Sequence, residues 1–308
     1  MPCDHTSTVA DIVVQPPQSA TWQVHLDRSM WVGGVRGLML QALHPLAMLG
    51  VWQNSNFQAD PFGRLRRTAD FVGRVTFGTP EEAAEIGRRV RALHRGLRIT
   101  DPATGRTHRV DDPELLLWVH CAEVSSYLEV ARRGGLGLTG RQADRYLAEQ
   151  RASAAYVGLH LDDVPGSRAE LDAYFERVRP SLRVTEEAAS TVRFLLWPRL
   201  PRELRLLSPA RPGYFPFGAL CYYTLPRWAR RMYGVLPEVP RGAVTAGLQA
   251  FRFALNSLPE HLHDRAFMPS TRQMLSDSRS RLGAAGYDVS RGLKGLTDPR
   301  RWPKAPAT

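Results

Sequence analysis

Helix start and stop signals recur along this chain, and they restrict its fold more than any other feature. The stretch GTPEEAAEIGRRVRALHRGL, residues 78–97, opens with Thr79 as an N-cap, Pro80 at the first helical position and two glutamates in the first turn. It closes with Arg95 and Gly96, a basic residue and then a glycine, as helix ends commonly do. The sequence therefore predicts a helix from Thr79 to Gly96.

Similar periodicity and capping recur through most of the chain, whereas alternating strand patterns are almost absent and no internal repeat is visible. Pro45 predicts a bend in the helix expected over residues 25–52. Asp60 is the expected N-cap of the next helix, which begins at Pro61. The turn-rich segment 98–110 is compatible with a small hairpin. The further predicted helices cover residues 25–52, 61–75, 111–135, 139–161, 167–182, 185–197 and 241–258. These elements indicate an all-α fold, a single globular multi-helix domain with a possible hairpin.

The two ends of the chain differ from its centre. Residues 1–20 contain paired prolines and small polar residues, which is typical of a flexible N-terminal arm. Residues 276–308 lose helical periodicity and gain glycine, proline and positive charge, so we expect a basic tail that wraps the surface or is partly disordered. The helical domain is accordingly predicted to span residues 21–275.

The net charge of +11 comes almost entirely from arginine, since Lys294 and Lys304 are the two lysines of the chain. Nucleic-acid binding favours basic residues clustered on one stripe with exposed aromatics. Here the arginines alternate with acids, as in DRYLAEQR and FERVR, which is typical of solvated helix faces. We therefore expect no nucleic-acid partner.

The three cysteines, Cys3, Cys121 and Cys221, are widely spaced and form no CxxC pair. Neither a disulfide framework nor a structural zinc site is indicated. The first residues also lack the basic and apolar regions of a secretory signal, so the default expectation is a cytoplasmic protein with reduced thiols.

Residues 37–59 contain no Asp, Glu, Lys or Arg. Their apolar part is short and is interrupted by Gln41, His44 and Pro45, so it does not predict a membrane span. A buried core helix is the favoured interpretation, and a weak contact with a membrane surface is the alternative.

Arg64, Arg67 and Thr68 are spaced so that they share one face of a helix. This pattern is compatible with a solvated basic face or with a cationic, hydroxyl-bearing binding surface. His94 lies at the edge of the apolar stripe of the next helix, where it is either a hydrogen-bonded core residue or a metal or heme ligand.

Two more histidines lie in apolar surroundings. His120, in LLLWVHCAEV, shares a face with Leu116 and Val124 and is expected to be buried. His44 precedes Pro45, which leaves a backbone carbonyl without its helical donor, and His44 is either a local partner of that carbonyl or a wall of a pocket. The pattern alone leaves these alternatives open.

Several catalytic motifs are missing. A di-iron carboxylate site needs two Glu-x-x-His units, and only Glu260 and His263 have this spacing, in a polar run after Pro259. The motifs of serine hydrolases, phosphate-binding loops and zinc peptidases are absent.

Four stretches together resemble the catalytic domain shared by the MpaB-type oxygenases and the rubber oxygenase known as latex clearing protein. They are ALHPLAMLGVWQNSNF, DPFGRLRRTADFVGRVTFGTPEEA, VRALHRGL and DDPELLLWVHCAEVSSYL. The resemblance covers roughly residues 25–260, and its specific motifs lie between His44 and Tyr127.

The resemblance implies an all-helical protein that binds a b-type heme through one axial histidine, next to a helix with the motif Arg-x-x-Lys-Thr. By this resemblance His94 is the expected iron ligand, with His120 as the alternative, and His44 and Arg64 are further candidates for heme contact. Arg64, Arg67 and Thr68 are the candidate catalytic residues, which would position propionates, dioxygen or substrate. Arg67 stands where the motif has lysine, and an arginine does not lose its proton to act as a base or an iron ligand.

Rubber oxygenases also carry a catalytic carboxylate upstream of this helix. The corresponding stretch here, LAMLGVWQNSNFQA, contains no acid. This difference is evidence against cleavage of polyisoprene, but it is compatible with a heme oxygenase that acts on another substrate.

The sequence thus leads to two functional hypotheses. The first is a heme b-dependent oxygenase that uses dioxygen on an apolar or aromatic small molecule, with oxidative cleavage of a carbon–carbon double bond as one candidate reaction. The alternative is a helical heme- or ligand-binding protein without turnover. Neither hypothesis specifies the oligomeric state.

Overall fold

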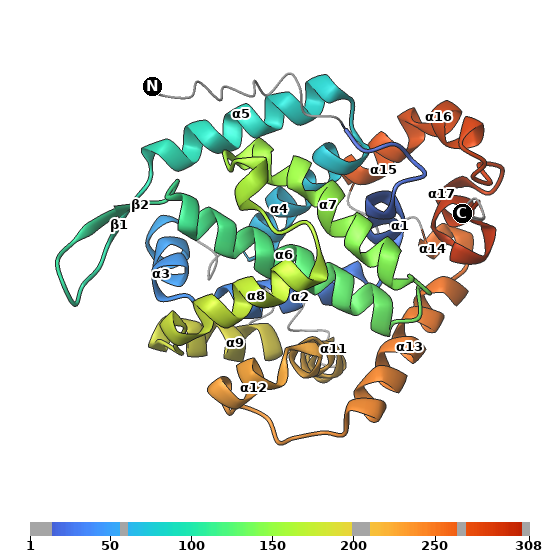
Figure 1. The fold of residues 1–308 in the computed structure, drawn as a ribbon. Coiled ribbons are helices and arrows are strands. Elements are labelled where there is room, and N and C mark those ends of the chain that lie inside the picture. Colours follow the sequence, from blue (N-terminus) through green and yellow to red (C-terminus); the bar gives the residue numbers. More distant parts are fainter. Residues whose placement is uncertain (1–13, 56–60, 199–209, 264–268, 304–308) are drawn as a thin grey trace.

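The computed structural model describes residues 14–55, 61–198, 210–263 and 269–303. Within these ranges the chain is mostly helical and has one two-stranded antiparallel sheet, which confirms the all-α fold with a small hairpin (Figure 1). The first elements are α1 (Ala20–Leu26), α2 (Met30–Gln41), α3 (Pro45–Asn54), α4 (Pro61–Phe77), α5 (Pro80–Gly96), β1 (Arg98–Thr100), β2 (Thr107–Arg109) and α6 (Pro113–Arg133). The later elements are α7 (Gly140–Val157), η2 (Leu161–Asp163), α8 (Arg168–Val178), η3 (Arg179–Ser181), α9 (Glu186–Leu196), α11 (Ala210–Thr224), α12 (Arg227–Tyr233), α13 (Arg241–Ser257), α14 (Glu260–His263), α15 (Pro269–Asp277), α16 (Arg279–Ala284), α17 (Gly292–Thr297) and η5 (Pro299–Arg301).

The helix termini follow the predicted signals where capping chemistry is strong. Thr79 and Glu82 form a capping box at the start of α5, each side chain accepting a hydrogen bond from the other residue's backbone amide. The single helix predicted over residues 25–52 is instead three helices. Pro45 starts α3 rather than bending a continuous helix, because its missing amide is tolerated in a first turn. The predicted cap Asp60 lies outside the described residues.

The centre of the molecule is α6, which packs against α1, α2, α3, α7 and α13 (Figure 1). Its tightest neighbour is α2. A Cβ added at Gly33 would lie 2.8 Å from the ring of Tyr127 and 3.3 Å from the carbonyl oxygen of Ser126. The absence of a side chain at Gly33 therefore lets the two helices approach closely.

The uncharged stretch 37–59 contributes to this main core, because Met39, Leu40, Leu43 and Met48 are all buried. Its residues 56–59 lie outside the described ranges. Among the helices that the structure describes, none combines the length and apolar character required to span a bilayer. The alternative of a weak membrane-surface contact remains a prediction.

The C-terminal stretch that we expected to be a tail contains α16 and α17 and packs onto the rest of the protein, on the side opposite the β1–β2 hairpin (Figure 1). Leu282, Tyr287 and Leu296 share a buried apolar cluster with Trp22 of α1 and Phe77 of α4. These apolar residues are spaced over several short helices, so no single periodic stripe shows them in the sequence. Residues 304–308 and the N-terminal residues 1–13 lie outside the described ranges.

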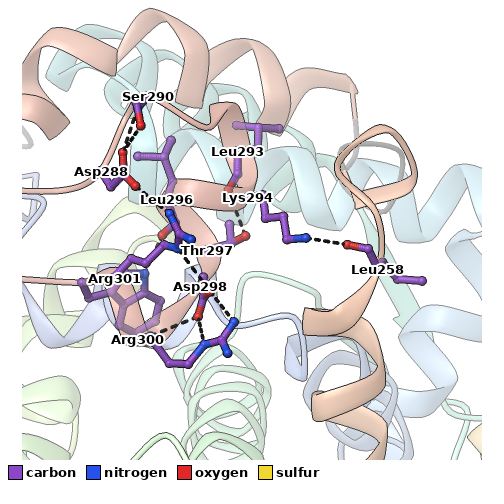
Figure 2. Close-up of polar contacts among 11 residues, drawn as sticks. Leu258, Asp288, Ser290, Leu293, Lys294, Leu296, Thr297, Asp298, Arg300 and Arg301 are labelled. Atoms are coloured by element: carbon purple, nitrogen blue, oxygen red, sulfur yellow. Dashed lines mark hydrogen bonds and ion pairs between the residues drawn. The ribbon is translucent and has the colours of Figure 1, made fainter.

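Polar contacts hold this segment in place (Figure 2). The Asp298 carboxylate accepts hydrogen bonds from Arg300 at 2.7 and 2.8 Å, and Arg301 donates to Asp288 at 2.9 Å. Lys294 reaches back to the main body, where its ammonium donates to the carbonyl oxygen of Leu258 at 3.0 Å. The basic residues of this segment thus form hydrogen bonds and ion pairs that hold its fold, in addition to giving its surface a positive charge.

Candidate functional site

A partly open, mainly apolar cavity of about 90 Å³ lies where α1, α4, α5, α6 and α7 meet. Most of its walls are aliphatic and aromatic side chains, and three histidines and two glutamates line it as well. The cavity-lining residues used below are His25, Phe71, Val72, Val75, Thr76, His94, His120, Glu123, Tyr127, Glu149 and Tyr156. The cavity thus combines apolar walls with ionisable groups, which is typical of ligand sites.

His94 reaches the cavity from α5. This helix lies close against α7 because Gly87 has no side chain; a Cβ there would be only 3.0 Å from the Tyr156 carbonyl oxygen. Arg91 of α5 donates a hydrogen bond to the same carbonyl oxygen at 2.8 Å. The Nδ1 atom of His94 is buried and has no hydrogen-bond partner. Burial lowers the pKa of His94, although Asp111 opposes the shift, so the neutral imidazole is favoured.

His120 reaches the cavity from α6 and is 8% exposed. Its Nε2 atom is buried without a hydrogen-bond partner. Burial lowers its pKa to about 4, so the ring is neutral at physiological pH. A neutral imidazole with a free ring nitrogen is the form that binds a metal ion.

His25 also lines the cavity, and the sequence analysis missed it. Its two ring nitrogens lie 2.8 Å from the Thr76 hydroxyl and 3.2 Å from the Tyr146 hydroxyl. Burial lowers the pKa of His25 to about 3. Because both nitrogens are engaged, His25 joins α1 to α4 and α7 and does not present a free ligand atom.

Glu123 is the second cavity residue that the sequence analysis missed. It follows His120 by three residues on the same helix face, so the spacing in HCAE was the available signal. The Tyr127 hydroxyl donates to its carboxyl oxygen at 3.1 Å, and burial raises the pKa of Glu123 to about 7.

Glu149, by contrast, is occupied by structural contacts. Its carboxylate accepts hydrogen bonds from the Thr21 amide at 2.8 Å and from the Arg145 guanidinium at 2.7 Å. Glu123 is therefore the cavity carboxyl that is available to a ligand.

The structure does not bring Arg64, Arg67 and Thr68 into the cavity lining. Arg67 and Thr68 are exposed, whereas Arg64 is half-buried and donates to the Ser55 hydroxyl at 3.0 Å. Burial lowers the pKa of Arg64, with a smaller contribution in the same direction from Arg67. Thr68 lies one turn before the cavity residue Val72, so the predicted arginine face continues along α4 to the cavity.

His44 also lies outside the cavity lining. Its Nδ1 atom accepts a hydrogen bond from the Ala47 amide at 3.4 Å, so it caps α3, and its ring lies 6.0 Å from that of Trp118. This contact is to an amide and not to the carbonyl that Pro45 leaves free, so it is not the local partnership considered for His44.

Comparison with known proteins gives the family. Residues 22–272 match the family described as "ER-bound oxygenase mpaB/B'/Rubber oxygenase, catalytic domain". The chain belongs to this family. The match is somewhat longer than the stretch of resemblance noted in the sequence, and it includes all the cavity-lining residues except Gln15 and Thr21. Family membership indicates an oxygenase. Neither a curated protein nor a solved structure matches the chain.

The cavity residues of this MpaB and rubber oxygenase domain have some of the features that a heme site requires. Two neutral imidazoles with free nitrogens and apolar walls fit the chemistry of a heme site, which needs only one or two protein ligands. Among the described residues, no group of three or more His, Cys, Asp and Glu side chains is arranged as a metal cage. The cavity volume is below the roughly 300 Å³ at which ligand pockets begin, so a heme requires the surrounding helices to move apart.

Proposed function

We propose that this protein is a heme b-dependent oxygenase that acts on an apolar or aromatic small molecule. The observation that carries the proposal is the pair of unpartnered imidazole nitrogens, His94 Nδ1 and His120 Nε2, in one apolar cavity of a chain from an oxygenase family. Such a pair leaves two buried polar atoms unsatisfied, which is costly unless a ligand uses them.

His94 is the proposed iron ligand, with His120 as the alternative. His94 is half-buried and lies between Arg91 and Arg95 on α5, and these cations could neutralise the propionates of a heme. His120 is deeper, in the centre of α6. A bound heme would supply the iron that binds and activates dioxygen.

The other cavity residues have roles that follow from their surroundings. Phe71, Val72 and Val75 offer apolar contacts to a substrate and exclude water. Glu123 can hold or release a proton at its carboxyl group near neutral pH, and Tyr127 orients that group. Arg64, Arg67 and Thr68 remain proposed contacts for substrate or propionates at the start of α4.

The absorption spectrum of the protein after addition of hemin tests the proposal. A Soret band typical of an imidazole-bound heme is expected, and it should be lost in His94→Ala. His160→Ala is the matched control, because His160 is exposed and outside the cavity lining. Loss of the band in His120→Ala but not in His94→Ala would identify His120 as the iron ligand. A wild-type protein that binds no heme would contradict the proposal.

One observation favours the alternative, a helical heme- or ligand-binding protein without turnover. The small cavity volume of about 90 Å³ leaves no space for a substrate beside a cofactor unless the helices separate. Dioxygen consumption by the heme-loaded protein with a set of apolar and aromatic substrates distinguishes the two. Turnover supports the oxygenase, whereas a loaded protein that stays inert with all of them supports the alternative.

A further inference from the structure

A second hollow, with a volume of about 1160 Å³, lies on the other side of α6 from the cavity. We call it the arginine groove, and it is lined by residues of α2, α6, α8, α12, the α11–α12 turn and the start of α13. On α6 the groove is lined by Leu128, Glu129 and Arg132, whereas the cavity is lined by His120, Glu123 and Tyr127. The two hollows share no lining residue, so the groove is a separate feature.

The groove carries an excess of positive charge, with eight arginines and four carboxylates among its lining residues. Arg36 lies at its base and is 4% exposed. Its guanidinium donates to the Thr224 carbonyl oxygen at 3.0 Å and to the Ser126 hydroxyl at 2.5 Å, which are both neutral acceptors. Among the described residues no carboxylate lies within ion-pair distance of it.

Burial lowers the pKa of Arg36 to about 10, so the side chain is still charged at neutral pH. Glu129 favours the charge from a longer distance and Arg133 opposes it. A buried cation without a bonded anion is costly, and an anion bound in the groove would reduce that cost.

Two further arginines have unused hydrogen-bonding capacity. The Nε atoms of Arg179 and Arg230 are buried and have no hydrogen-bond partner. The Arg230 side chain is 12% exposed, and its terminal nitrogen lies 3.1 Å from Glu238. A terminal nitrogen of Arg179 lies 2.6 Å from Glu176, so each arginine has one carboxylate partner at a terminal nitrogen and an unused donor at Nε. A ligand with an anionic oxygen could satisfy these donors with charge-assisted hydrogen bonds.

Apolar side chains line the groove beside these cations. The Arg179 guanidinium lies 5.1 Å from the centre of the Trp228 ring, which places a cation next to an aromatic surface. Phe175, Leu171 and Leu128 extend the apolar lining. The volume of about 1160 Å³ slightly exceeds the range of about 300–1000 Å³ found for ligand pockets, so the groove can hold a ligand with a sizeable apolar body.

We propose that the arginine groove binds an amphipathic organic anion, a carboxylate or phosphate monoester with an alkyl or aromatic body. The anionic group bonds to Arg230 and Arg179, and the body packs on Trp228 and Phe175. This site does not depend on the proposed heme.

Isothermal titration calorimetry of the full chain with decanoate, decyl phosphate and 1-decanol tests this site. Both anions should bind, and decanol should bind roughly tenfold or more weakly, because it lacks a charge-assisted hydrogen bond. The two anions separate a preference for carboxylate from one for phosphate. Affinity for the anions should fall as salt is added. Equal affinity for decanoate and decanol, or no binding of either anion, would overturn the proposal.

Variants locate the site. Arg230→Gln should weaken decanoate binding by about tenfold and leave decanol unchanged, whereas Trp228→Ala should weaken both. Arg89→Gln on α5 is the charge-matched control, because its side chain is 71% exposed and lies outside the groove. Arg179→Gln provides a second test at a side chain that is 38% exposed, should Arg230→Gln prove unstable. An equal effect of Arg89→Gln and Arg230→Gln would show diffuse charge attraction and overturn the site.

The failure of this proposal is distinguishable from failure of the proposed function. Hemin is itself an amphipathic anion and could enter the groove, but no histidine lines it. The Soret band of an imidazole-bound heme should therefore be unaffected by Arg230→Gln. A band that depends on His94 and decanoate binding that depends on Arg230 are separate results, and either can hold without the other.

Discussion

Burial shifts the pKa values of the cavity histidines and of Glu123 in opposite directions. It lowers the pKa of His94 and His120 and raises that of Glu123, because an apolar environment disfavours each charged form. Near neutral pH both imidazoles are therefore uncharged, and Glu123 lies close to its titration midpoint. The cavity thus has free imidazole nitrogens for a ligand and a carboxyl group that can exchange a proton.

Glu123→Gln should change how stability depends on pH. The folded protein raises the pKa of Glu123 from an ordinary 4.5 to about 7, so it binds more protons than the unfolded chain between these values. The wild type should lose stability as the pH rises through this window, on the order of 3 kcal/mol in total, and the variant should lack this loss. Urea unfolding at pH 4, 6 and 8 measures the difference. Parallel pH profiles for the two proteins would contradict the shifted pKa.

At the level of secondary-structure elements, the contact between α2 and α6 supports both hollows. The α2 stretch WVGGVRG contains three glycines, and Gly33 and Gly37 face Tyr127 and Ser126 of α6. The cavity lies on one side of α6 and the arginine groove on the other, with Arg36 reaching the groove from α2. Gly33 is therefore required by packing rather than by an unusual backbone conformation, whereas a Cβ at Gly34 or Gly37 would make ordinary contacts.

Gly33→Ala should destabilise the protein by about 1–3 kcal/mol, because its methyl group would meet the ring and backbone of Tyr127 in a well-packed interface. Gly34→Ala is the matched control. Its nearest neighbours would lie 3.9 Å away, so better helix propensity should leave the protein unchanged or up to about 1 kcal/mol more stable. Thermal and urea unfolding of the two variants measure this difference. Equal effects of both substitutions would contradict the close approach.

At the level of the whole molecule, the C-terminal segment completes the fold around α1 and α4. Leu282 and Leu296 pack with Trp22 and Phe77, which are far from them in sequence. Residues 78–96, which include His94, follow directly after Phe77 in the chain. The segment therefore supports the end of α4 from which α5 continues.

Leu296→Ala tests whether this segment is part of the folded body. Leu296 is 1% exposed, and its truncation should cost about 2–5 kcal/mol in the free energy of unfolding. Leu262→Ala is the control, since Leu262 is 41% exposed and its truncation should change stability by about 0.5 kcal/mol or less. Chemical unfolding monitored by circular dichroism gives both values. A loose tail would make the two substitutions equally mild.

The helices that carry their own capping chemistry were predicted well from the sequence. Thr79 and Pro80 mark the start of α5 by local hydrogen bonding and backbone geometry, and these do not depend on the rest of the fold. The segment 210–233 was not predicted as helical, because three prolines and two glycines interrupt the pattern. Packing onto α2 and α9 supports α11 instead.

The candidate site also combines features predicted from local sequence with features that depend on tertiary packing. Local sequence was enough to single out His94 and His120, since each lies on or beside an apolar helix stripe and within a motif of the family. It did not show that the two histidines line one cavity with Glu123, or that His25 uses both nitrogens in structural hydrogen bonds. Spacing along a helix determines which side chains share a face, whereas the contacts between helices decide which faces meet. The cavity, the arginine groove and the packed C-terminal segment all depend on contacts between residues distant in the chain, and these exist only in the tertiary structure.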